Sequence, residues 1–401
     1  MPSFWGIGPG QLARAMGLEM RRASSMTRPA FFGVLLTDRS RAALAMSTGL
    51  PGTVLDAMHL SRYDGTLLDM SAVTQESEVS PRTVWSTQWV QLYASRCCPR
   101  CLAENTVWPL WWRLESAAVC PRHRCLLLDI CPSCNIRFRR GNQQIPRGLL
   151  TNHGVLDPRL CGNRARGAGG PQSVLCQHPV AELPVTGLTD DTVLAVQELM
   201  LSAANNQPMT LLGQTVSSAE WFSGVKYLIA MARFTVTDAE VDSLPAATIS
   251  SMVDYQHRRV TLGRLGPKLQ NGPETAAEAA ALYSLVGPIV LAPDVGTAHE
   301  RLGPWVHRVA QYRSRSRNRD PFLHVDRPAS VDAAVRSLTP HANRVIGPAR
   351  SLPQITGITP LRRPGPRADG RACSQPRRRI EAGGGNRALH RHRPPRSARG
   401  P

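Results

Sequence analysis

The chain has 401 residues, of which 42% are hydrophobic and 5% aromatic, and its formal net charge is 48 − 29 = +19. This length allows two or three domains with buried cores. No stretch approaches the ~18 consecutive apolar residues of a membrane span, and the first residues lack the basic head and apolar run of a signal peptide. We therefore expect a soluble, cytoplasmic, nucleoid-associated protein without a membrane partner.

The positive charge is concentrated near the end of the chain. Residues 361–401 hold twelve Arg and two acidic residues, which is +10 of the total, so the other 360 residues carry +9. An excess of cationic side chains usually indicates an anionic partner, most often nucleic acid. The moderate excess outside the tail favours a DNA-binding surface on the folded part.

Residues 1–78 are expected to form an N-terminal helical segment. In "RAALAMSTGLPGTVLDAMHL", which spans residues 41–60, Ala45 is followed four residues later by Gly49 and then by the apolar Val54 and Leu55. A small Ala lets two helices approach, and Gly takes a turn conformation that other residues resist. The pattern is typical of a helix-turn-helix, although a plain pair of packed helices explains it about as well.

Residues 79–182 form a segment rich in cysteine. Seven of the ten cysteines lie within "CCPRCLAENTVWPLWWRLESAAVCPRHRCLLLDICPSCN", residues 97–135. In a reducing cytosol, clustered cysteine favours metal over disulfides. A C-x2-C turn directs two thiolates at one centre, and a second pair completes the tetrahedron that zinc prefers. The two predicted ligand sets are Cys98, Cys101, Cys120 and His123, and then Cys131, Cys134, Cys161 and Cys176, with His178 as a reserve ligand for the second set.

Each predicted set supplies four protein ligands and leaves no position for a reacting water. We therefore expect two structural zinc ions in two loop-rich fingers. A cross-braced connectivity, in which the first and third cysteine pairs share one metal, stays open, although the short gap between His123 and Cys131 favours sequential sites. Cys97, Cys125 and Cys373 are interpreted as inert cysteines. The segment "WPLWWRLESAAV" is expected to pack over the metal sites, and bases stacking on exposed Trp is the alternative.

Residues 186–350 are expected to form an all-helical domain. "TDDTVLAVQELMLSAANN" begins with Thr and Asp and places apolar residues at helical spacing, and "SSAEWFSGVKYLIAMARF" begins with Ser and an acidic residue. Residues 351–401 are rich in Arg, Pro and Gly, which predicts a disordered tail. The predicted fold class is thus mainly α, with a small loop-rich zinc module, a helical C-terminal half and a disordered basic tail.

Two basic runs are the candidate DNA contacts, since Arg to phosphate is the common mode of contact. An ordinary solvated surface explains either run equally well. No enzyme is expected, because the sequence offers no nucleotide-binding Gly-rich loop, no open metal site and no nucleophile–base pair. The candidate residues are Arg137, Arg139 and Arg140 beside the second finger, and Arg313, Arg315, Arg317 and Arg319 at a helix end.

The order of motifs across residues 85–180 resembles the TniQ family. In that family a Cys-Pro-x-Cys-Leu motif, a Trp-Arg-Leu segment, a Cys-Pro-x-His motif, an apolar strand ending in Asp, and a Cys-Pro-x-Cys motif follow one another. In this chain they are Cys98–Leu102, Trp112–Leu114, Cys120–His123, Leu126–Asp129 and Cys131–Cys134. The stretch with Cys161, Cys176 and His178 resembles the long finger of the actinobacterial members. The resemblance is looser over residues 1–75, and from residue 186 it rests mainly on helical character.

The resemblance implies a role in choosing the target site of a transposon. Such proteins bind DNA or a DNA-bound complex and recruit the transposon's AAA+ ATPase, which engages the transposase. In CRISPR-associated transposons the family member acts as a dimer on an RNA-guided effector, so a guide-RNA complex and a second copy are further implied partners. Two alternatives are a zinc-finger transcription regulator unrelated to transposition and a purely bridging protein whose helical half docks the ATPase.

Two departures from the family pattern concern the ends of the chain. The opening segment is shorter than usual, and "SLPQIT" at residues 351–356 resembles a family segment whose continuation is missing. The Arg/Pro-rich sequence that follows predicts a frame-shifted or otherwise abnormal tail, whose charge would then be accidental.

Overall fold

Helices dominate the part of the chain that the structure describes, which confirms a mainly α protein. The structure is a computed structural model, and it describes residues 9–20, 29–31, 33–138, 157–163, 165–166, 175–263, 268–315, 321–322 and 324–344. These residues all belong to one compact unit, Met1–Arg350. The predicted tail, residues 351–401, lies outside the described residues. The domain boundaries predicted at residues 78, 182 and 186 stay predictions.

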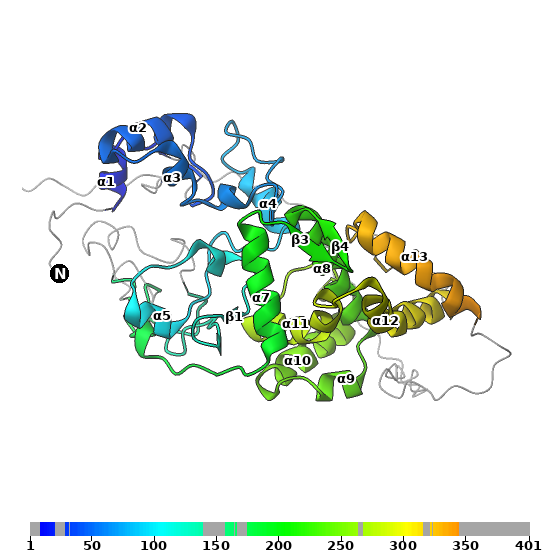
Figure 1. Ribbon diagram of the computed structural model, residues 1–401. Coiled ribbons are helices and arrows are strands. Elements are labelled where there is room, and N and C mark those ends of the chain that lie inside the picture. Colours follow the sequence, from blue (N-terminus) through cyan, green and yellow to red (C-terminus); the bar gives the residue numbers. More distant parts are fainter. Residues whose placement is uncertain are drawn as a thin grey trace, which may run out of the picture. The chain divides into compact units, whose positions relative to one another are not determined.

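The N-terminal part contains short helices (Figure 1). Thr37 caps the second helix by accepting a hydrogen bond from the Ser40 amide, and Gly49 ends that helix in the left-handed region with φ 70°. The predicted glycine turn therefore exists, and it separates an 11-residue helix from one of only five residues. The elements of this part are α1 (Pro9–Ala15), α2 (Asp38–Thr48), α3 (Gly52–Asp56), the 3-10 helix η1 (Leu60–Tyr63) and α4 (Pro81–Thr87).

The Cys-rich segment has little regular structure. Its strands pair as one antiparallel hairpin, in which Cys120 lies opposite Cys125. An isolated bridge between Cys97 and Leu128 joins the residue before the first cysteine pair to the chain that leaves this hairpin. The elements are α5 (Pro99–Glu104), η2 (Leu110–Arg113), β1 (Val119–Cys120), β2 (Cys125–Leu126) and η3 (Val180–Glu182).

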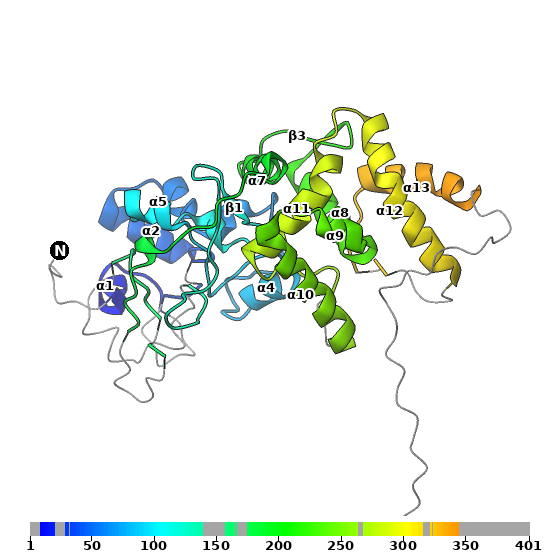
Figure 2. The same ribbon diagram turned by 90° about the horizontal axis from the view of Figure 1, so that it is seen from below.

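The C-terminal part is a bundle of longer helices. The helix α11 (Ala276–Val290) contacts α7 (Asp191–Ala204), α8 (Ser218–Thr235), α10 (Ala246–Leu262) and α12 (Val295–Arg315), and it lies among them in Figure 2. Side-chain caps fix the starts of two predicted helices: Asp190 accepts from two amides of α7, and Ser217 accepts from the Glu220 amide of α8. The remaining helices are α9 (Asp238–Asp242) and α13 (Ala329–Arg344).

One element contradicts the expectation that this half is all-helical. Met209–Leu211 (β3) and Gln214–Val216 (β4) pair as an antiparallel hairpin. Leu212 and Gly213, at its tip, both have positive φ, 51° and 73°, as a two-residue hairpin turn requires. The hairpin packs against α8 through Leu211, which approaches Gly224 so closely that a side chain there would collide with it.

The buried apolar residues form two clusters. The larger one runs from Val34 in the N-terminal part to Ala334 in α13 and includes residues of the Cys-rich segment such as Val119. The smaller one gathers the cysteines around Trp112, Leu102 and Phe138. Within the described residues, no helix is both long and apolar enough to cross a membrane.

Candidate metal centres

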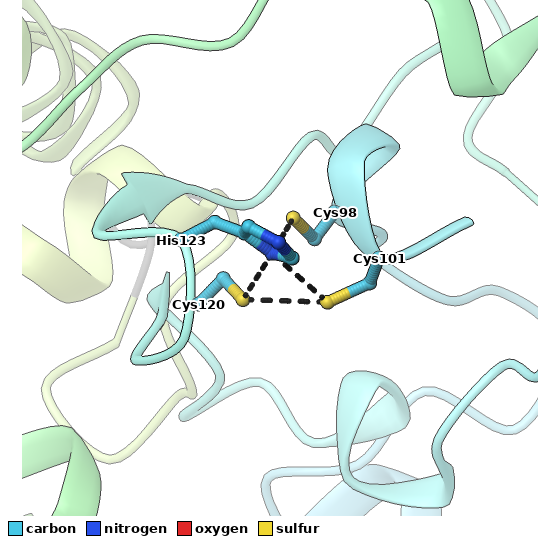
Figure 3. Close-up of side chains that lie close together, drawn as sticks. All are labelled: Cys98, Cys101, Cys120 and His123. Atoms are coloured by element: carbon cyan, nitrogen blue, oxygen red, sulfur yellow. Dashed lines mark hydrogen bonds between the residues drawn. The ribbon is translucent and has the colours of Figure 1, made fainter. Parts of the chain in front are cut away.

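The first candidate centre brings together Cys98, Cys101, Cys120 and His123, as the spacing predicts (Figure 3). The Nδ1 atom of His123 lies 3.5 Å from the Cys98 sulfur, 3.2 Å from the Cys101 sulfur and 3.5 Å from the Cys120 sulfur. A tetrahedral zinc with bonds of ~2.3 Å to sulfur and ~2.0 Å to nitrogen requires S···N edges of about 3.6 Å. The four atoms are therefore spaced as ligands of one ion.

Local structure places these four side chains. Cys98 is the N-cap residue of α5, Pro99 starts the helix, and Cys101 lies in its first turn. Proline suits the first helical position because its fixed φ is already helical and no amide is lost there. Cys120 ends β1, and His123 lies in the tight turn that returns the chain to β2. A helix start and a hairpin turn thus face each other across the centre.

Glu104 holds the imidazole of the first centre. Its Oε1 atom lies 3.0 Å from His123 Nε2, while Nδ1 faces the three sulfurs. In the tautomer in which Nδ1 binds a metal, Nε2 carries the proton and donates a hydrogen bond to Glu104, an arrangement that orients metal-binding histidines. Glu104 is not among the residues predicted from the sequence. Its position three residues after Cys101, on the same face of a short helix, is the signal that could have found it.

The second candidate centre consists of Cys131, Cys134, Cys161 and Cys176. The sulfurs of Cys131 and Cys176 are 3.8 Å apart, and so are those of Cys134 and Cys161. Four thiolates around zinc at ~2.3 Å require S···S edges of about 3.8 Å. His178, the reserve ligand, does not join this group. Its carbonyl instead accepts from the Cys161 amide.

The grouping of ligands follows the chain order. The first four candidate ligands gather at one point and the last four at another. The cross-braced alternative required Cys98 and Cys101 to share a centre with Cys131 and Cys134, and the folded chain does not bring these pairs together.

Contacts between the thiols of the first centre shift their pKa values. Contacts with Cys120 and Cys125 lower the pKa of Cys98, and the same contacts raise the pKa of Cys120 and of Cys125. Burial raises the pKa of Cys101 to about 11. These contacts therefore favour the ionised form of Cys98 and disfavour it at the neighbouring thiols. A divalent metal would offset the mutual repulsion of three thiolates and displace their protons.

The cysteines outside the two groups are buried in the same core. Cys97 and Cys125 are each 0% exposed. Cys125 lies 3.7 Å from the Cys98 sulfur but outside the ligand group. Cys373 lies outside the described residues.

The tryptophans pack around the centres as predicted. Trp112 is fully buried among the cysteines, and the Trp108 ring meets it edge-on with centroids 5.6 Å apart. The Trp108 indole nitrogen donates to the Pro158 carbonyl at 2.9 Å, which ties this segment to the chain that leads to Cys161. The tryptophans therefore form a wall of the module, the interpretation favoured over base stacking.

A buried arginine joins the Cys-rich module to the helical half. The Arg96 guanidinium, 0% exposed, forms an ion pair with Asp129 at 2.8 Å and donates to the carbonyl of Pro273 at 3.0 Å. The other oxygen of Asp129 accepts from the Ala276 amide at the start of α11. Asp129 lies two residues before Cys131, so the second centre is tied to α11 by a short chain of contacts.

The basic runs proposed for DNA are described only in part. The half-buried Arg137 donates to the Glu274 carbonyl at 2.9 Å, and Arg313 is exposed on α12. Arg315 ends α12, but its side chain is outside the described residues. DNA contact by any member of the two runs stays a prediction. Arg139, Arg140, Arg317 and Arg319 also lie outside the described residues.

Comparison with known proteins supports the family resemblance. Residues 4–127 match the family model of TniQ. This range covers the whole first centre, and it ends before the second. No curated protein and no solved structure matches the chain.

Proposed function

Because residues 4–127 match the TniQ family model, which associates the chain with transposition, we propose that it is a zinc-stabilised, DNA-binding adaptor for target-site selection. In this role it recruits the transposon's AAA+ ATPase and, through it, the transposase. The observation that carries the proposal is the match together with the first cluster, since Cys98, Cys101, Cys120 and His123 lie within the matched range.

The donor sets fit zinc as the resident metal. Three thiolates with one imidazole, and four thiolates, are the soft ligand sets that zinc takes in structural sites. Zinc when bound would supply a divalent charge and four bonds per centre. The chain itself supplies the buried wall around Trp112 and the second contact to His123 from Glu104. With four protein ligands each, the centres have no open position for substrate, so the proposed role is that of a non-enzymatic adaptor.

DNA contact would depend on arginine side chains at the surface. Arg313 is exposed on α12, and Arg137 is half-buried and donates to the Glu274 carbonyl. Replacing a phosphate-contacting arginine lowers the salt dependence of binding by about one released counterion. We therefore expect Arg313→Ala to flatten the salt dependence, and we expect Arg137→Ala to act mainly on stability.

The test is a mobility-shift titration with duplex DNA and zinc over a range of salt concentrations. It uses the full chain and a chain ending at residue 350, which removes the basic tail. Binding by both chains, weakening linearly with the logarithm of the salt concentration, would support the proposal. No duplex binding by the shorter chain at low salt would remove direct DNA recognition and leave the adaptor role.

The adaptor role has a test of its own. Zinc-loaded protein should retain the purified AAA+ ATPase of the same transposon in a pull-down assay, and protein stripped of metal should not. Retention of the ATPase by neither form would contradict recruitment, whatever the DNA result. A guide-RNA effector complex and a second copy of the chain are further partners that the family resemblance supports, and the same assay with each as prey tests them.

A further inference from the structure

The pair of helices α2 and α3 exposes large apolar side chains to solvent. Met46 on α2 is 88% exposed, and Val54 and Met58, on and just after α3, are 41% and 55% exposed. Leu50, in the turn between the helices, is 37% exposed. Single exposed apolar residues are ordinary, but four within 13 residues of chain are typical of a surface that another protein covers. Methionine is common at such surfaces because its flexible side chain adapts to a partner.

This helix pair is the predicted helix-turn-helix, yet its second helix lacks what DNA requires. The residues of α3, Gly52–Asp56, include no cation and one acid. His59 follows the helix, and burial lowers its pKa, which favours the neutral ring. The nearby Arg41 is engaged by Asp56 and Asp38, each at 2.9 Å. A helix that reads the major groove presents cationic or amide side chains to phosphates and base edges, and α3 presents Val54 and Met58 instead.

A groove of about 500 Å³ lies beside α3. Its apolar lining includes Leu35, Leu36 and Ala57, and Arg41 and Arg62 line it as well. Val54 and Met58 are four residues apart, and Ala57 keeps helical backbone angles, so the two side chains lie on one face. A ridge of two apolar side chains beside a groove with both apolar and polar lining residues accommodates an amphipathic helix with anchors every three or four residues.

The charges around the groove indicate what the occupant carries. Arg62 donates to the neutral Asn205 amide oxygen at 3.2 Å and stacks on the Tyr63 ring, 5.4 Å from its centroid. Within the described part of the chain it has no carboxylate partner. The charged residues that line the groove are Arg41, Arg62 and Asp56, which is 2 − 1 = +1, and Asp38, outside this lining, pairs with Arg41. An occupant with a carboxylate is therefore favoured over a neutral or basic one.

We propose that the α2–α3 surface, defined by Met46, Leu50, Val54, Met58 and the adjoining groove, docks an acidic amphipathic helix of a partner protein. Two aliphatic or aromatic side chains of that helix pack on Val54 and Met58, and a carboxylate pairs with Arg62. A second copy of this chain fits less well, because the two carboxylates beside this surface, Asp38 and Asp56, already pair with Arg41 and leave none for Arg62 of the other copy. This inference goes beyond DNA binding and ATPase recruitment, because it assigns the predicted helix-turn-helix to protein recognition.

The test is selection of short helical peptides, displayed on phage, on the immobilised zinc-loaded full chain, followed by fluorescence anisotropy with the enriched peptides. We expect them to share apolar residues three or four apart and at least one acid. Val54→Lys should weaken binding about tenfold or more, and Arg62→Glu should weaken it for acidic peptides. The matched control is Val260→Lys, since Val260 is 67% exposed on α10 and should not matter.

Several results would overturn the proposal. One is that no peptide is enriched, or that the enriched peptides bind Val54→Lys as well as the unchanged chain. If the enriched peptides lack acidic residues, or bind Arg62→Glu as tightly as the unchanged chain, the proposed pairing of a carboxylate with Arg62 is wrong. Loss of duplex binding or of self-association in Val54→Lys, with zinc content and circular dichroism unchanged, would assign the surface to DNA or to a second copy.

Discussion

Replacing Arg96 by methionine tests how the Cys-rich module is attached to the helical half. The guanidinium is fully buried. It forms an ion pair with Asp129 and donates hydrogen bonds to the backbone carbonyls of Glu115, Ala117 and Pro273. Methionine fills most of the volume but donates nothing. Asp129 would keep its hydrogen bond from an amide but lose its counter-ion. Because its side chain is only 13% exposed, water would solvate the remaining charge poorly. Removing one member of a buried ion pair costs about 3–5 kcal/mol, and the orphaned carbonyls add to this.

The control is Arg336→Met on α13. That arginine also contacts a carboxylate, Asp332, at 2.7 Å, but its side chain is 76% exposed. Exposed pairs four residues apart on a helix contribute about 0.3–0.5 kcal/mol. Two arginine–aspartate pairs of similar length should thus differ about tenfold in their effect on stability, because only one is desolvated.

The assay is urea unfolding followed by far-UV circular dichroism at a fixed zinc concentration, because metal that binds only the folded state shifts the apparent stability. With a slope of about 3 kcal/mol per molar urea, Arg96→Met should lower the unfolding midpoint by about 1 M or more. Arg336→Met should leave it almost unchanged. A loss below about 1 kcal/mol for Arg96→Met would refute the reasoning, since Asp129 and the carbonyls would then be satisfied without the arginine.

Three further predictions concern metal content, helix packing and pH. Cys101→Ser should reduce bound zinc, measured by mass spectrometry, from two equivalents to about one, whereas Cys125→Ser should keep both, since only Cys101 belongs to a ligand group; equal losses would contradict the ligand sets. Gly224→Ala should destabilise the protein by about 1–3 kcal/mol, because its methyl group would meet Leu211. A methyl group at Gly303 would have no neighbour within 4 Å, so Gly303→Ala should stabilise α12 by about 0.5–1 kcal/mol in the same urea assay. If Gly303→Ala proved less stable than Gly224→Ala, the packing argument would be wrong. Burial raises the pKa of Glu115 to about 7, so the charged form is disfavoured in the folded state and stability falls as pH rises through that value. Glu115→Gln should therefore gain up to about 3 kcal/mol relative to the unchanged chain as the pH rises from 4.5 to about 7, and a difference that does not vary with pH would contradict this assignment.

The parts of the fold that the sequence predicts correctly depend on short stretches of chain. The C-x2-C and C-x2-H spacings determine which side chains can converge, and the structure gathers both ligand groups as the spacing predicts. The starts of α7 and α8 follow from Asp190 and Ser217, whose caps act over two or three residues. Such features can be predicted because the residues that cause them are neighbours in sequence.

What sequence reasoning missed depends on residues far apart in the chain or on weak local signals. The hairpin β3–β4 has three-residue strands, too short for a period-two pattern to stand out, and Leu212 adopts a positive φ that its residue type does not indicate. The basic run around Arg137 predicts a DNA contact, and this stays a prediction. The bond of Arg137 to the Glu274 carbonyl, 137 positions away, could not be predicted without the tertiary fold.

The contacts of the loop before α11 explain why the Cys-rich module and the helical bundle should respond to metal together. From the module side, Trp89 donates to the Gln270 carbonyl, Arg96 to the Pro273 carbonyl and Arg137 to the Glu274 carbonyl. From the bundle side, the buried Arg233 donates to the Asn271 carbonyl. These donors act on backbone carbonyls that no helix or strand satisfies, so the loop keeps its position only while both sides are folded. Loss of metal from the module would remove one set of donors, and the start of α11 should then exchange its amide hydrogens faster although it lies outside both ligand groups.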